Sequence, residues 1–290
     1  MDYLKFPKNF AEIPESFSGY NNSMVVVLPF PYEKTTCYVK GTENGPDAIL
    51  RASSEMELYD EELGNVFEAG ICTLKPLKVN DKPELMVGVV YKNIKNLLKD
   101  EKFIVTLGGE HSITSGIVMA FKEKYNDLSV LQIDAHADLR KEFEGSRHSH
   151  ACAMRRTMEI CPVVQVGIRS LSYEESEFIK EKKLKIFWAK DIVDNDKWFD
   201  DSIKRLSKNV YITLDLDGLD SSIMPSVGTP EPGGLGYYQI LRFIKKVCEK
   251  RNVVGLDVVE LCPNEHNVAP DFTAARIVYK LIGYKFTKKK

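Results

Sequence analysis

LSVLQIDAHAD, residues 128–138, holds both the pattern that sets the fold and the first candidate site. Its first half, Leu128–Ile133, is a short apolar run with β-branched residues, which is typical of a strand buried on both faces. In an extended segment residues i, i+2 and i+4 share one face, so we expect Asp134, His136 and Asp138 to converge. Two carboxylates and an imidazole after an apolar strand are costly to desolvate unless a cation holds them. The stretch therefore predicts a metal site at a strand end.

Similar apolar runs on both sides of this stretch predict about eight strands. They are Met24–Leu28, Val66–Gly70, Phe103–Leu107, Leu128–Ile133, Pro162–Val166, Leu184–Trp188, Val210–Leu214 and Val253–Val258. Most segments between them have helical periodicity, with one apolar face predicted for Met86, Val89, Val90, Ile94 and Leu97. Alternating strands and helices predict βαβ units and a parallel sheet covered by helices. Periodicity alone leaves open whether the sheet stays open or closes into a barrel.

Composition places the chain among ordinary globular proteins. Its 290 residues, 43% of them hydrophobic and 28% charged, show no repeat or linker, so we expect a single domain over residues 1–290. The net charge of −2 disfavours a nucleic-acid partner. No apolar run approaches the roughly 18 residues of a membrane span, and the first ten residues lack a secretory signal. We expect a cytoplasmic protein that does not bind membranes.

The cysteines do not indicate a disulfide framework or a zinc knuckle. All six lie far apart, and none forms a CxxC pair. We expect them to be reduced.

Two other strand ends carry polar groups that could join the first site. Phe103–Leu107 is followed by two glycines, Glu110 and His111, where a single histidine is as well explained by a buried hydrogen bond as by a metal. Val210–Leu214 is followed by Asp215 and Asp217, which would share a face in an extended chain.

Together these strand ends predict a site for two metal ions. Six side chains would converge: His111, Asp134, His136, Asp138, Asp215 and Asp217. One ion rarely needs so many charged ligands, whereas the four carboxylates would balance two divalent cations. Carboxylate and imidazole ligands without thiolate favour Mn²⁺ over structural zinc.

Two further groups are candidates for the chemistry. Glu260 follows the strand Val253–Val258; it is either a surface acid or a negative group that suits a cationic substrate. His148 and His150 lie in a loop before Arg155 and Arg156, which we expect on a helix. This loop is either plain surface or the source of a proton donor for a leaving amine.

These blocks, in this order and spacing, resemble the ureohydrolase family of arginases and agmatinases over almost the whole chain. The main matches are LGGEHSIT at 107–114, LQIDAHAD at 131–138, TLDLDGLD at 213–220 and GTPEPGG at 228–234. Supporting matches are GTENGPDAILRAS at 41–53, VQVGIRS at 164–170 and LDVVELCP at 256–263. The resemblance implies an open, mostly parallel eight-stranded sheet between helix layers, a three-layer α/β/α arrangement rather than a barrel.

The resemblance also implies roles for the candidate residues. One Mn²⁺ would be held by His111, Asp134, Asp138 and Asp215, and the other by His136, Asp134, Asp215 and Asp217. A hydroxide shared by the metals would attack a guanidinium carbon. Asp138 would orient the hydroxide, Glu260 would pair with the guanidinium, and His150 would pass a proton to the leaving amine.

Agmatine is the substrate that the resemblance favours. Arginases carry an asparagine soon after the DAHxD block, whereas Leu139 and Arg140 follow it here, as in many bacterial agmatinases. The products would be urea and putrescine, in polyamine biosynthesis. Residues 221–227 and 263–270 depart from the family pattern, so another guanidino compound stays open.

Several alternatives to an agmatinase also stay open. Within the family they are a guanidinobutyrase, an arginase and a formiminoglutamase. Outside catalysis, the alternative is a metal-binding family member without activity. The resemblance further implies a homo-oligomer, either a trimer or a hexamer.

Overall fold

Eight parallel strands form one central sheet in the computed structural model of the chain, which describes residues 2–77 and 82–287. Their order across the sheet is β4-β1-β5-β10-β9-β6-β7-β8. The strands are β1 Val25–Phe30, β4 Ile71–Thr73, β5 Phe103–Gly108, β6 Leu128–Ile133, β7 Val163–Ile168, β8 Ile186–Trp188, β9 Asn209–Asp215 and β10 Asn252–Val259. A small hairpin pairs β2 Tyr59–Asp60 with β3 Gly64–Asn65 in antiparallel fashion.

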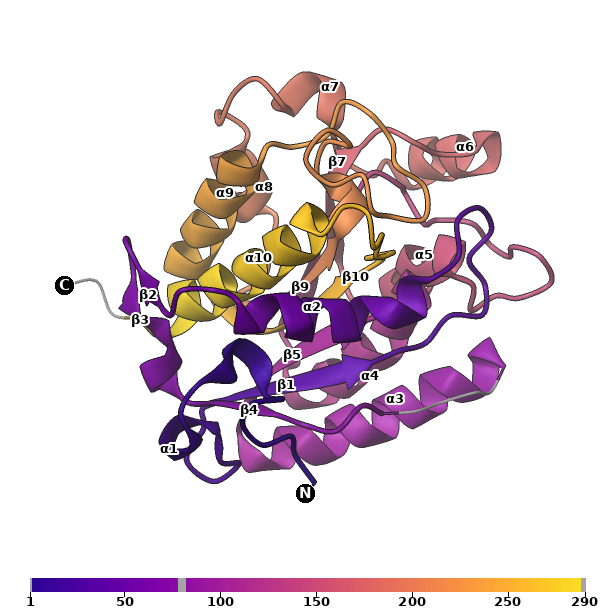
Figure 1. The fold of residues 1–290 in the computed structure, drawn as a ribbon. Coiled ribbons are helices and arrows are strands. Elements are labelled where there is room, and N and C mark those ends of the chain that lie inside the picture. Colours follow the sequence, from indigo (N-terminus) through magenta and orange to yellow (C-terminus); the bar gives the residue numbers. More distant parts are fainter. Residues whose placement is uncertain (1, 78–81, 288–290) are drawn as a thin grey trace.

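Helices cover both faces of the sheet (Figure 1). One layer contains α3 Pro83–Leu97, α4 Thr114–Lys124 and α5 Ala153–Met158, with α3 packed on α4 and α4 on α5. The other contains α2 Gly45–Ser54, α9 Tyr237–Lys250 and α10 Ala269–Phe286, with α10 packed on both α2 and α9. The remaining helices are α1 Glu15–Ser18, α6 Tyr173–Lys182, α7 Ala189–Ile192 and α8 Phe199–Lys204. The expected open three-layer α/β/α fold is confirmed.

The strand order brings the candidate residues to the middle of the sheet. The neighbouring strands β5, β10, β9 and β6 are each followed by one of the polar segments found in the sequence. β5 and β6 follow each other along the chain but lie apart, because β10 and β9 come between them. Ligands of open parallel sheets bind beside such a change of strand order, at the carboxyl ends of the strands.

One predicted strand was wrong. Val66–Ala69 is a 3-10 helix, and the strand of this region is β4, which begins at Ile71. Gly70 separates the two with a φ of 72°, a backbone conformation that turns the chain and favours glycine. An apolar run with β-branched residues looks the same in a buried turn and in a buried strand, so the pattern did not separate them.

The helix predicted from the repeat of Met86, Val90, Ile94 and Leu97 is confirmed as α3, and these four side chains are buried. Val87 is buried on this face, while the predicted Val89 is only partly covered. Among the described residues, no helix combines the length and the apolar character that crossing a membrane requires.

Candidate metal centre

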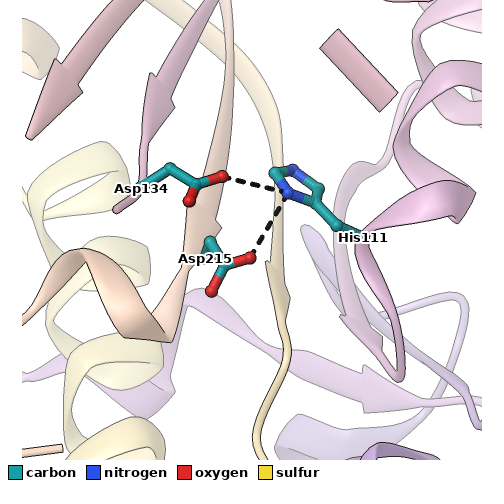
Figure 2. Close-up of side chains that lie close together, drawn as sticks. All are labelled: His111, Asp134 and Asp215. Carbon is teal, nitrogen blue, oxygen red and sulfur yellow. Dashed lines mark ion pairs between the residues drawn. The ribbon is translucent and has the colours of Figure 1, made fainter. Parts of the chain in front are cut away.

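All six predicted metal ligands lie within one cluster at the carboxyl end of the sheet. His111 begins a 3-10 turn after β5, and Asp215 ends β9. Figure 2 shows the His111 ring facing the carboxylates of Asp134 and Asp215. Oxygens of Asp134, Asp138 and Asp215 lie 3.2, 3.0 and 3.3 Å from His111 Nδ1. A second group joins the first through Asp134, since His136 Nδ1 lies 3.8 Å from Asp134 Oδ1 and 2.8 Å from Asp217 Oδ2.

The side chains converge for a different reason from the one predicted. β6 ends at Ile133, so Asp134 to Asp138 do not continue as a regular strand. Asp138 has a φ of 52°, in the left-handed region that costs a non-glycine residue roughly 1–2 kcal/mol. Asp217 lies in a 3-10 turn, and the backbone amide of Asp217 donates to Asp215 Oδ1 at 3.0 Å. Turns after the strands, rather than one shared extended face, bring the groups together.

Electrostatics in the cluster favour a bound cation. Burial, with the charges of Asp217 and Asp138, raises the pKa of Asp134 to about 7. Burial and Asp217 also raise the pKa of Asp215 well above its ordinary value. Burial acts to lower the pKa of His111, yet the neighbouring carboxylates raise it well above the ordinary value. These carboxylates crowd one another and gain from any positive charge placed among them.

The donor set fits a pair of divalent metal ions. Two groups of three side chains have ligand atoms close enough to share an ion: His111, Asp134 and Asp215, and Asp134, His136 and Asp217. His111 Nδ1 is buried and makes no hydrogen bond to any described residue, although three carboxylate oxygens surround it. A cation at this point would give that nitrogen a partner and neutralise the carboxylates.

Amide side chains in the strands hold Asp134 in place. Gln132 is buried in β6 and donates from Nε2 to Asp134 Oδ2 at 2.6 Å. Gln165, buried in β7, donates in turn to Gln132 Oε1 at 2.6 Å. The amide of His136 donates to Asp134 Oδ1 at 2.6 Å. Both carboxylate oxygens of Asp134 are therefore oriented before any metal is bound.

A buried relay holds His111 from the other side of its ring. His111 Nε2 lies 2.8 Å from Thr213 Oγ1, and that hydroxyl donates to Asp257 Oδ1 at 2.5 Å. Because the Thr213 proton goes to Asp257, Oγ1 accepts from His111 Nε2–H, and Nδ1 is the nitrogen that faces the carboxylates. Tyr211 and Thr114 donate to the other oxygen of Asp257, at 2.8 and 3.0 Å.

If His111 is a metal ligand, Thr213→Val is expected to weaken metal binding about 10- to 100-fold, because the relay fixes the ring of His111. Valine keeps the shape of the side chain and removes only the hydroxyl. Tyr211→Phe is the matched control, since it takes one hydrogen bond from Asp257 and leaves the relay whole. Titrating both variants with Mn²⁺ in a competitive chelator measures the effect; equal affinities for the two would contradict the role of Thr213.

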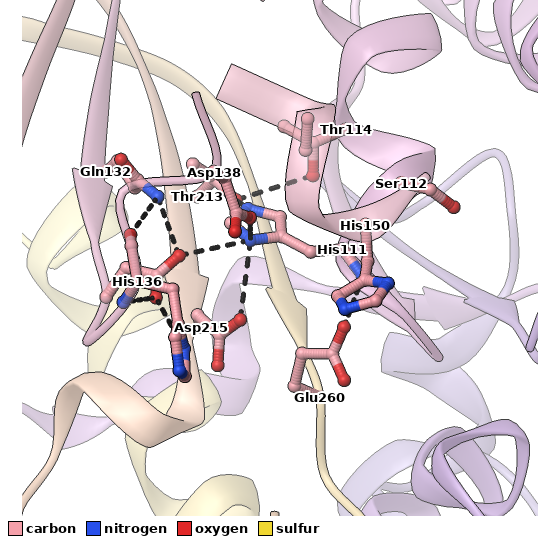
Figure 3. A network of polar contacts seen from close by, with 12 residues as sticks. His111, Ser112, Thr114, Gln132, His136, Asp138, His150, Thr213, Asp215 and Glu260 are labelled. Atoms are coloured by element: carbon pink, nitrogen blue, oxygen red, sulfur yellow. Dashed lines mark hydrogen bonds and ion pairs between the residues drawn. The ribbon is translucent and has the colours of Figure 1, made fainter. Parts of the chain in front are cut away.

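One cavity of about 210 Å³ connects the cluster with the predicted catalytic groups, and both Glu260 and His150 line it. Glu260 is 7% exposed and has a φ of 66°. Its Oε1 accepts from the amide of His111 at 2.7 Å, while Oε2 accepts no hydrogen bond from the described residues. Burial raises the pKa of Glu260 well above its ordinary value, so a cationic partner would stabilise the carboxylate. Figure 3 shows these groups around His111.

Cys152, His148 and His266 do not line this cavity. Cys152 is buried and directs its thiol to the Ser146 carbonyl. Residues of the altered segments 221–227 and 263–270, with His266 among them, instead line a second hollow of about 1160 Å³. Gly228 and Thr229, just beyond the first segment, do line the cavity.

The sequence did not reveal the supporting groups Gln132, Gln165, Thr213 and Asp257. All four are polar residues inside strands that are otherwise mostly apolar, where a buried polar side chain needs a partner. The polar residues within apolar runs were visible in the sequence, although the hydrogen-bond partner of each was not.

Comparisons with known proteins agree with this geometry. The Arginase family model matches residues 23–283. The chain is 44% identical to an N(1)-aminopropylagmatine ureohydrolase of Synechocystis sp., covering 96% of this chain and 94% of that protein. A protein of the same name from Thermus thermophilus is 41% identical, with 93% of each chain covered. The crystal structure of the agmatine ureohydrolase of Thermoplasma volcanium superposes with a TM-score of 0.87 at 31% identity, covering 96% of this chain and 94% of that one.

The family resemblance of the sequence is thereby confirmed, and with it a metal-dependent hydrolysis of amidino C–N bonds. The chain belongs to the arginase family and is a ureohydrolase.

Proposed function

We propose that the chain uses two Mn²⁺ ions to release urea from a linear guanidino-alkylamine, with N(1)-aminopropylagmatine preferred to agmatine. The observation that carries the two-metal part is the meeting of four carboxylates and two imidazoles at the ends of β5, β6 and β9. One ion would be held by His111, Asp134, Asp138 and Asp215, and the other by His136, Asp134, Asp215 and Asp217. Asp134 and Asp215 would be shared.

The nature of the donors supports manganese. Oxygen donors outnumber imidazoles in the cluster, and no thiol belongs to either group of described residues that could hold an ion. Carboxylate-rich sites suit Mn²⁺, whereas structural zinc sites are dominated by thiolate and imidazole. Bound metal ions would supply Lewis acidity and lower the pKa of the water that attacks the guanidinium carbon.

The residues of the chain divide the remaining work. Glu260 would receive the guanidinium on Oε2, the oxygen that its contact with His111 leaves free. Asp138 would accept a hydrogen bond from the attacking water and so orient it. His150 would give a proton to the leaving nitrogen as the C–N bond breaks, since an amine leaves more readily when protonated. The products are urea and the amine.

The preferred substrate differs from the agmatine favoured by the sequence alone. Two relatives above 40% identity are named N(1)-aminopropylagmatine ureohydrolases, which supports the longer substrate. The cavity supports it as well, because Tyr38 and Val39 belong both to its wall and to the wall of the second hollow. A longer tail has room there, and Tyr38 and Phe143 can contact ammonium groups through their rings. Resemblance to the family supports a homo-oligomer that serves cytoplasmic polyamine synthesis.

A substrate panel on manganese-loaded protein tests this proposal. Urea or formamide release would be followed with N(1)-aminopropylagmatine, agmatine, 4-guanidinobutyrate, arginine and formiminoglutamate. We expect a kcat/KM for N(1)-aminopropylagmatine at least about tenfold above that for agmatine. This ratio corresponds to roughly 1.4 kcal/mol, the contribution of one ammonium contact that the shorter agmatine cannot make. Preference for agmatine would contradict the longer substrate, and preference for arginine would contradict the alkylamine class. Bound manganese without turnover on any compound would favour a non-catalytic protein.

A further inference from the structure

A buried carboxylate beside the metal cluster ties the loop after β1 to the turn after β5. Glu110 is fully buried, and its Oε2 accepts from the amides of Lys34 and Thr35 at 2.6 and 2.7 Å. Its Oε1 accepts from the hydroxyls of Thr35 and Ser112 at 2.7 and 2.5 Å. Four donors thus hold Glu110, and neither the metal cluster nor the proposed reaction uses it.

Thr35 carries this contact on to His150. The amide of His150 donates to Thr35 Oγ1 at 2.9 Å, and His150 Nδ1 lies 3.1 Å from the same oxygen. Thr35 and His150 are 115 residues apart in the sequence. The hydroxyl of Thr35 therefore lies between a buried carboxylate and the ring proposed to move a proton.

The hydrogen bonds of Thr35 determine which nitrogen of His150 carries hydrogen. A hydroxyl has one proton, and that of Thr35 goes to Glu110, so Oγ1 can only accept from the ring. His150 Nδ1 must then be protonated. Ser149 Oγ, 3.3 Å from Nδ1, can accept from the same N–H. Nε2, on the opposite edge of the ring, is the nitrogen left to exchange a proton within the cavity.

We infer that Thr35, anchored by Glu110, is a positioning residue that holds His150 in the tautomer needed for proton transfer through Nε2. The inference rests on the proposed role of His150. In this step Nε2–H of the charged ring gives its proton to the leaving nitrogen, which keeps the electron pair of the broken C–N bond. Water has supplied the oxygen of urea, and the proton released from that water restores Nε2–H. If the neutral ring carried its single proton on Nε2 instead, Nε2 could not accept the proton that the water releases.

Thr35→Val in the manganese-loaded protein is expected to lower kcat about 10- to 100-fold, which is part of the roughly 10²- to 10⁴-fold that a positioned acid contributes, and to change KM less than about threefold. Thr35→Ser keeps the hydroxyl and is expected to restore most of kcat. Thr73→Val is the matched control. Thr73 is a buried threonine in the edge strand β4, and its hydroxyl also accepts a hydrogen bond from a backbone amide, that of Phe10. Manganese content would be measured for every variant.

A double-mutant cycle separates positioning from a general structural role. If Thr35 acts through His150, Thr35→Val should change kcat less than about twofold in a His150→Asn background. The same fold loss in both backgrounds, or a kcat for Thr35→Val within threefold of the unchanged protein, would overturn the inference. Full activity of His150→Asn would instead remove the proposed role of His150 itself, on which the inference depends.

Discussion

Asp134→Asn is expected to abolish measurable urea release and to remove manganese from both positions. Asp134 is the residue common to the two groups of ligand atoms, with Oδ2 near His111 and Oδ1 near His136. Asparagine would lose the negative charge and would place a donor where Gln132 now donates. Because bound metal stabilises the transition state by several kcal/mol, we expect a loss in kcat/KM on the order of 10³-fold or more.

Asp127→Asn is the matched control for this variant. Asp127 immediately precedes β6, at the opposite end of the strand from Asp134, and accepts from the amide of Lys208 on the surface. The control should keep both metal ions and full turnover. Elemental analysis after dialysis, together with a urea assay, measures both quantities. Unchanged metal content in Asp134→Asn would contradict the assignment of Asp134 as the shared ligand.

Glu260→Gln is expected to lower kcat/KM about 10²- to 10³-fold while both metal ions stay bound. Breaking a buried, charge-assisted pair costs roughly 2–5 kcal/mol, and a guanidinium facing a neutral amide loses that interaction. Glutamine has the same shape and can still accept from the amide of His111 through its carbonyl oxygen. The loss should therefore come from substrate recognition and not from a distorted site.

Kinetics on agmatine and N(1)-aminopropylagmatine would measure this effect, with manganese content determined in parallel. Glu15→Gln provides a control, since Glu15 is an exposed carboxylate in α1 that lines neither the cavity nor the second hollow, and its loss should leave kcat/KM unchanged. Should Glu260→Gln turn over both substrates as fast as the unchanged protein, Glu260 would not be the partner of the guanidinium.

The fold was largely predictable because its pattern is repeated along the chain. Buried parallel strands are continuous apolar runs, and seven of the eight predicted runs overlap observed strands. Val66–Gly70 failed because a buried 3-10 turn has the same composition as a short strand. The two-residue strands β2 and β3 were not predicted, since so short a hairpin has no periodicity to detect.

The candidate metal ligands were predictable from their chemistry and from the topology of a parallel sheet. Carboxylates and imidazoles after apolar strands are costly unless they share a cation, and parallel strands end at the same edge. The left-handed backbone of Asp138 and Glu260 could not be predicted, because positive φ is uncommon for every residue other than glycine, even for aspartate, which adopts it more often than most.

Residues that position a catalytic group without touching the substrate could not be predicted from the sequence either. Thr35 meets Glu110 and His150 only because two distant loops fold over the same turn, and nothing in the pattern around Thr35 distinguishes it from a surface threonine. The substrate tail is a similar case, since the groups that would contact it come from several loops.

The number of metal ions needed for activity tests the paired site most directly. Protein stripped of metal would be titrated with Mn²⁺ while bound metal and urea release are followed together. We predict that activity reaches its maximum at two equivalents per chain, with both ions retained in the active protein. Full activity with a single bound equivalent would contradict the two-metal site.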